Sequence, residues 1–193
     1  MRPIIGDLLE EYREVVLPAR GRARAAIWFM TQLAGLVKPW MWGVIIGLVF
    51  GIENLVSTAI SPLAEDTPAL MLTLVTVVLG SWILVGFSAG RRTMRVRDAV
   101  LAGVVVATIS MSLFGMANWV RVTVFLDVIK DRSDWVGLMD RFHASGAPDL
   151  RSFVMSEYSR GNLLSTAVIA GIGGAMGALG GLVGVRRHRA STR

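Results

Sequence analysis

The chain has 193 residues, of which 53% are hydrophobic and only 18% charged, and its mean hydropathy is +0.58. About a quarter of the residues of a soluble domain are usually charged, so this composition excludes the ordinary soluble class and predicts a membrane protein. The net charge of +6 lies in blocks beside apolar runs, which favours anionic lipid headgroups over nucleic acid as a partner. The absence of Cys excludes disulfides and thiol chemistry.

Residues 1–38 predict a cytoplasmic head of two amphipathic helices, broken at the sequence LPARG, where Pro18 and Gly21 interrupt the helical pattern. The second helix suits the membrane interface, with its basic residues on anionic headgroups. An alternative is that the head docks on another membrane subunit, because an anionic bilayer would repel the acidic residues around the first helix. The residues expected to contact headgroups or a partner are Arg20, Arg22, Arg24 and Trp28.

The stretch LLEEYREVVLPARGRARAAIWFMTQLAG, residues 8–35, resembles the juxtamembrane prefix that precedes the first span in bacterial ABC-transporter permeases of the macrolide-exporter type, and in related small membrane proteins. Those permeases also have a large extracytoplasmic domain and a different plan of spans, which this sequence does not match. The resemblance implies a bacterial inner-membrane protein connected with transport or membrane stress. The residues that carry it are Glu11, Tyr12, Arg13, Glu14, Pro18, Arg20, Gly21, Arg22, Trp28 and Phe29.

Four apolar segments are each long enough to cross about 30 Å of hydrocarbon, for which roughly 20 residues are needed. They cover residues 40–60, 69–87, 99–120 and 163–185. The sequence therefore predicts an all-α polytopic membrane protein, in which a four-transmembrane-helix bundle, residues 39–187, is followed by a basic tail, residues 188–193.

Lys and Arg are concentrated in the head, in the second connection and in the tail, whereas the first and third connections are acidic or balanced. The positive-inside rule then places both termini in the cytoplasm, and the resemblance implies that the membrane is the bacterial inner membrane. The second connection contributes Arg91, Arg92, Arg95 and Arg97. These four could clamp a phosphate or contact headgroups, but topology alone explains them.

The third connection, residues 127–162, predicts an extracytoplasmic helical hairpin. One helix is capped by Ser133 and carries Trp135 and Phe142 on an apolar stripe, and Pro148 opens a second one. The stripes either cover the outer ends of the spans or rest on the lipid interface.

Glu53 and Asn54 lie past the middle of the first predicted span. An acid in hydrocarbon costs roughly 2.5 kcal/mol or more, so Glu53 is the strongest single functional candidate. Counting about 1.5 Å per residue places it about 20 Å above the cytoplasmic edge, with its expected partners Asn118 and Arg121 roughly 8 to 12 Å higher. Glu53 is then protonated or reaching towards the outer surface, paired with Arg121, or used to handle protons or cations.

The fourth predicted span carries glycines at four-residue spacing, a pattern that lets helices approach closely in lipid. The pattern does not specify whether the partner helix lies in the same chain or in another copy. The glycines of the two series are Gly173, Gly177 and Gly181, and Gly180 and Gly184.

The sequence has no convincing catalytic pair, no metal-ligand spacing and no cofactor motif. We therefore expect a non-enzymatic accessory or regulatory subunit, without a cofactor, that associates with itself or with a transporter. The alternative is a small oligomeric channel or transporter with Glu53 in its pathway.

Overall fold

Helices account for nearly all of the part of the chain that the computed structural model describes, which is residues 9–36, 38–64 and 67–191. No strand occurs within these ranges. In chain order the helices are η1 (Tyr12–Val16), α2 (Leu17–Leu36), α3 (Pro39–Ile60), α4 (Pro68–Thr93), α5 (Val96–Ile129), η2 (Ser133–Trp135), α6 (Val136–Ser145) and α7 (Leu150–Ser191).

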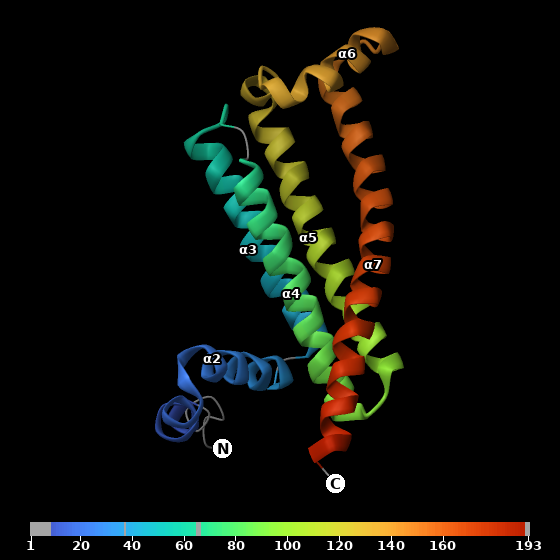
Figure 1. Cartoon of the computed structure of the whole chain (residues 1–193). Helices are drawn as coiled ribbons and strands as arrows, with labels where there is room; N and C mark the ends of the chain where they lie inside the picture. Colours follow the sequence, from blue (N-terminus) through green and yellow to red (C-terminus); the bar gives the residue numbers. More distant parts are fainter. Residues whose placement is uncertain (1–8, 37, 65–66, 192–193) are drawn as a thin grey trace.

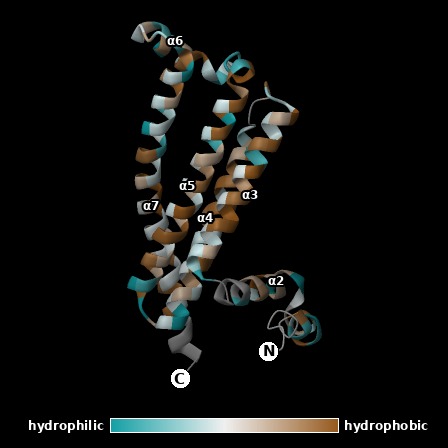
Figure 2. Ribbon diagram, turned by 180° about the vertical axis from the view of Figure 1, so that it is seen from behind, coloured by the Kyte–Doolittle hydropathy of each residue, from teal (hydrophilic) through white to brown (hydrophobic). Residues whose placement is uncertain are grey.

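Four helices, α3, α4, α5 and α7, are long and apolar enough to cross a membrane, which confirms the predicted all-α membrane bundle. They run side by side, with α2 and the end of α7 at one end and α6 at the other (Figure 1). We call these the terminal end and the α6 end. Hydrophobic residues dominate the length of the bundle, and hydrophilic ones gather towards its two ends (Figure 2).

Two of the spanning helices are much longer than the apolar segments predicted within them. α5 has 34 residues and α7 has 42, which at about 1.5 Å per residue gives lengths of about 51 and 63 Å. Both exceed a hydrocarbon layer of about 30 Å, so the bundle continues beyond it.

The head is a short helical hairpin that lies crosswise to the bundle at the terminal end (Figure 1). Its break occurs at Gly21, inside the predicted LPARG sequence, where the backbone adopts φ 71° and ψ 162°. This conformation is almost confined to glycine. η1 is wound as a π-helix and folds back on α2, so that the rings of Tyr12 and Phe29 lie 5.2 Å apart.

The predicted hairpin between residues 127 and 162 is only partly correct. Its first helix is present as η2 and α6, but the second is not a separate element, because α7 runs without interruption from Leu150 into the fourth span. Nothing breaks the helix between these segments: Gly161 continues it with open space beside its Cα.

Aromatic residues of these apolar stripes pack on the neighbouring helix α7. Trp135 is buried and stacks on Tyr158 of α7 with ring centroids 5.9 Å apart, and Phe142 contacts Phe153 at 5.6 Å. Trp135, Tyr158 and Phe153 belong to a small core at the α6 end that also includes the last turns of α5. Trp135 thus packs over the ends of α5 and α7, and contact of the stripes with the lipid interface stays a prediction.

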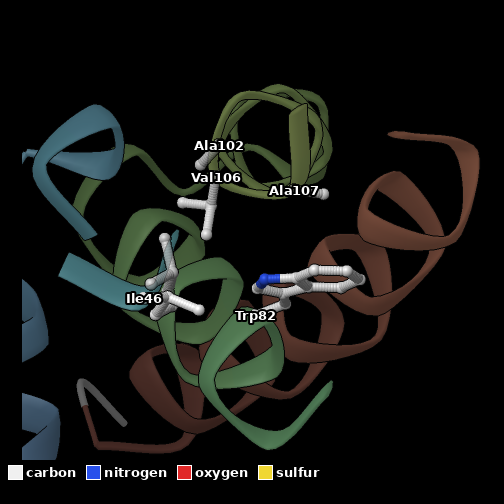
Figure 3. Close-up of a cluster of buried hydrophobic side chains, with 6 residues drawn as sticks. Ile46, Trp82, Ala102, Val106 and Ala107 are labelled. Carbon is white, nitrogen blue, oxygen red and sulfur yellow. The ribbon is translucent and has the colours of Figure 1, made fainter. Parts of the chain in front are cut away.

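The interior of the bundle is formed where α3, α4, α5 and α7 approach one another. Trp82 of α4 is buried and extends towards α7, with Ile46 of α3 and Val106 and Ala107 of α5 around it (Figure 3). Small residues let the helix backbones meet on either side of this cluster. The bundle is consequently well packed from this cluster down to its terminal end.

Candidate functional site

The polar residues of α3 and α5 meet towards the α6 end. Asn54 Nδ2 donates a hydrogen bond of 2.7 Å to Asn118 Oδ1, and Arg121 Nη1 donates one of 3.2 Å to Asn54 Oδ1. The Asn54 carbonyl accepts from the Thr58 hydroxyl at 2.8 Å. The structure thus joins three of the four residues predicted as an intramembrane polar group, with Asn54 at their centre.

The contact depends on how far α3 is shifted along α5. A Cβ placed on Gly43 would lie 3.0 Å from the carbonyl oxygen of Val106, and one on Gly51 would lie 3.0 Å from Ala117 Cβ. The first turn of α3 is therefore level with the third turn of α5, about 15 Å from the start of that helix. The predicted gap of 8 to 12 Å arose from starting both helices at the same depth, and the shift closes it.

The same register sets the level of Glu53 relative to α5. No Asp, Glu, Lys or Arg occurs in α5 between Asp98 and Arg121, a distance of about 35 Å at 1.5 Å per residue, close to the thickness of the hydrocarbon layer. Arg121 therefore lies at the boundary on the α6 side. Since Asn54 contacts Arg121, its neighbour Glu53 lies close to the level of Arg121, and the membrane depth predicted for Glu53 stays a prediction.

Glu53 itself is exposed and forms no ion pair with any residue in the described ranges. The predicted Glu53–Arg121 pair is thus replaced by the Asn54–Arg121 hydrogen bond. Glu53 instead lines a pocket of about 270 Å³. The other residues that line it are Asn54, Ser57, Thr58, Ile60, Ser61, Ala64, Leu70, Arg121 and Arg132.

A second arginine enters this pocket from the turn between α5 and η2. Arg132 is only 6% exposed, and its guanidinium binds the Asp134 carboxylate through two bonds, of 2.9 and 3.1 Å. Such a two-pronged pair fixes the guanidinium in place and compensates for its burial. Tyr158 of α7 lies within electrostatic reach of Arg121, Arg132 and Asp134. The cluster thus connects α3, α5, η2 and α7.

The glycines of α7 face the interior of the chain, not its outer surface. Gly173, Gly177 and Gly181 are buried against α5, where the nearest residues are Ala99, Gly103 and Ala107. Gly180 and Gly184 pack against the α4 backbone at Ile83, Phe87 and Arg91. Both series therefore serve packing within the chain. Their partner glycines were not singled out from the sequence: Gly86 and Gly90 of α4 repeat the four-residue spacing, and Gly103 of α5 lies between Ala99 and Ala107 at the same spacing.

The basic residues predicted to contact headgroups or a partner gather at the terminal end. Arg22 and Arg24 are exposed on α2 and Trp28 is half-buried there, while the Arg20 side chain lies outside the described residues. Arg91 and Arg92 end α4, with Arg91 5.7 Å from the centre of the Phe87 ring. Arg95 and Arg97 are exposed at the start of α5. The prediction for these residues stays a prediction.

Two further observations bear on the chemistry of the chain. Within the described ranges, no three His, Asp or Glu side chains converge as a metal site would require. Comparisons with protein-family models, with curated proteins and with solved structures find no match.

Proposed function

We propose that this chain is a non-enzymatic accessory or regulatory subunit of the bacterial inner membrane, with both termini in the cytoplasm, which associates with itself or with a transporter. The exposed arginines at the terminal end support this orientation, because short segments rich in Arg stay on the cytoplasmic side. The α6 end is then extracytoplasmic.

The observation that carries the proposal is the closure of the bundle by backbone contacts. A Cβ on Gly86 of α4 would lie 2.5 Å from the Gly177 carbonyl oxygen, closer than real Cβ contacts allow. α5 is equally close to α7 at Gly103 and Gly173. Where a methyl group does not fit, neither does a hydrated ion or a substrate. A chain closed in this way acts through what binds to its surfaces.

The head offers the surface best suited to a protein partner. η1 and α2 form a folded hairpin, around which Glu10, Glu11, Arg13 and Glu14 are exposed. An anionic membrane surface repels such acidic residues and attracts the arginines of α2. The resemblance of this segment to the prefix of ABC permeases fits a partner of the transporter class.

The experiment is a gentle purification of the full-length protein from its native membrane, with mass spectrometry of whatever accompanies it. Replacing Glu10, Glu11 and Glu14 with Gln should release a partner that binds the head. The matched control replaces Asp127, Asp131 and Asp140, three exposed acids at the α6 end, with Asn and should retain it. A protein that purifies alone, or a partner lost equally from both variants, contradicts docking through the head.

The second candidate is a small oligomeric channel with Glu53 on its pathway. It is favoured by one observation: Glu53 is exposed on α3 among the exposed apolar residues Val49, Ile52 and Val56, so a neighbouring copy could enclose it. The pathway would then run between chains. Glu53→Gln should abolish ion flux in proteoliposomes without changing the size of the oligomer, and unchanged flux removes this candidate.

A further inference from the structure

The pocket at the α6 end carries charges of both signs. Arg121 and Arg132 line it together with the carboxylate of Glu53, and Asp134 pairs with Arg132. The two arginines are thereby balanced by two acids, so a ligand with a net charge gains little from the pocket as a whole. A ligand that itself carries one negative and one positive group can match both.

The size and the remaining lining of the pocket narrow the choice of ligand. Its volume of about 270 Å³ lies just below the roughly 300–1,000 Å³ of pockets for drug-sized molecules, which suits a small polar group. The hydroxyl groups of Ser57 and Ser61 lie along the same wall as Glu53. Hydroxyl and carboxylate oxygens accept hydrogen bonds from a primary ammonium, and guanidinium groups bind phosphate oxygens.

The position of the pocket points to a lipid. Arg121 lies at the edge of the hydrocarbon layer, the depth at which the phosphates and amines of phospholipids are found. Ile60 and Leu70 are the large apolar residues of the lining and are 77% and 41% exposed. They lead to the exposed apolar surfaces of α3 and α4, along which acyl chains can lie.

We propose that this pocket binds the headgroup of a phospholipid of the phosphatidylethanolamine class, from the leaflet on the α6 side. The phosphodiester lies against Arg121 and Arg132, and the ammonium against Glu53, which has no cation partner within the described part of the chain. This assignment is independent of the proposed accessory role, because it requires no partner protein.

The test is a titration of the delipidated, full-length protein with phosphatidylethanolamine and with phosphatidylglycerol, followed by native mass spectrometry. We expect phosphatidylethanolamine to bind about tenfold more tightly, because only its ammonium makes a charge-assisted hydrogen bond with Glu53. Glu53→Gln should remove that preference. Glu157→Gln, the same substitution on α7 outside the pocket, should leave it intact.

A second variant tests the other half of the site. Arg121→Gln should weaken the binding of both lipids by a similar factor, since both contain the phosphodiester. Tighter binding of phosphatidylglycerol, or a preference for phosphatidylethanolamine that survives Glu53→Gln, overturns the proposal. Soluble phosphoethanolamine should compete at least about a hundredfold more weakly than the lipid, because it lacks acyl chains. Equal competition overturns the assignment to a membrane lipid.

Discussion

The close contact between α4 and α7 makes Gly86→Ala a sharp test of the packing. A Cβ at residue 86 would lie 2.5 Å from the carbonyl oxygen and 2.6 Å from the Cα of Gly177. Both atoms are helix backbone, which cannot rotate away as a side chain can. To reach the 3.4 Å of ordinary contact, the two helices must separate by about 0.9 Å.

The expected change in the free energy of unfolding follows from two opposing effects. Forcing a methyl group into a packed interface typically costs about 1–3 kcal/mol, whereas replacing Gly with Ala inside a helix gains up to about 1 kcal/mol. Gly80, six residues away on α4, has no atom within 4 Å of its Cβ position. Gly80→Ala should therefore gain the stability of a better helix former without any cost of packing. The free energies of unfolding of the two variants should therefore differ by about 2 kcal/mol, with Gly86→Ala the less stable.

The assay is equilibrium unfolding of the full-length protein in detergent micelles with increasing dodecyl sulfate, followed by circular dichroism. Equal stabilities of Gly86→Ala and Gly80→Ala would refute the contact between α4 and α7. The native mass supplies a second readout. Because Gly86 and Gly177 are buried inside one chain, Gly86→Ala should not alter the number of chains in an oligomer. A folded Gly86→Ala variant that loses its oligomer would place these glycines between chains.

Three further predictions concern the register of the helices, a helix cap and the head. The chain has no Cys, so Asn54→Cys with Asn118→Cys should form a disulfide on mild oxidation, while a pair placed two turns lower on α5 should not; the reverse result refutes the register of α3. Asp149 accepts the Ser152 N–H at 2.8 Å at the start of α7, and hydrogen bonds from Ser152 hold the pKa of this exposed carboxyl below its ordinary value of 3.8. The cap is then present above about pH 4 and is lost as the pH falls through the lowered pKa. Amide chemical shifts of the first turn should change across that range in the wild type but not in Asp149→Ala, and identical behaviour of the two contradicts the cap. Gly21→Ala should cost about 1–3 kcal/mol and open the hairpin of the head, seen as faster proteolysis around residue 21; an unchanged rate contradicts the bend.

Much of the fold could be predicted because hydrophobicity along the chain is a local property. The four spans, the break at Gly21 and the buried stripe through Trp135 all follow from residue types within one or two helical turns. The meeting of Asn54 with Asn118 could also be anticipated, since polar side chains in a membrane helix usually find one another.

The position of one helix along another could not be predicted from local hydrophobicity. It is set by which glycine fits against which backbone, and α3 contains Gly43, Gly47 and Gly51 at the spacing already recognised in α7. That signal was present in the sequence, but spacing alone does not name the partner helix. A shift of α3 along α5 changes the depth of Glu53 by several residues without changing the hydrophobic pattern of either helix.

Arg132 and Asp134 were missed for a different reason. Two opposite charges two residues apart in a polar connection normally indicate a solvated loop. Arg132 is nevertheless buried, and it lines the pocket at the α6 end with its guanidinium paired to Asp134. The fusion of the second hairpin helix with α7 was missed because Gly161 weakens the helical pattern without breaking it.

The two ends of the bundle therefore differ in whether a ligand fits between the helices, and the difference follows from the residues that pack there. Towards the terminal end, Gly103 and Gly173 bring helix backbones so close that the interior admits nothing. Towards the α6 end, Asn54, Asn118 and Arg121 take the place of glycines, and their larger side chains leave a polar pocket beside α3. A ligand in that pocket cannot continue through the bundle, so its binding can influence only the helices around it. This packing fits the proposed accessory role, in which ligands and partners bind at the surfaces of the chain.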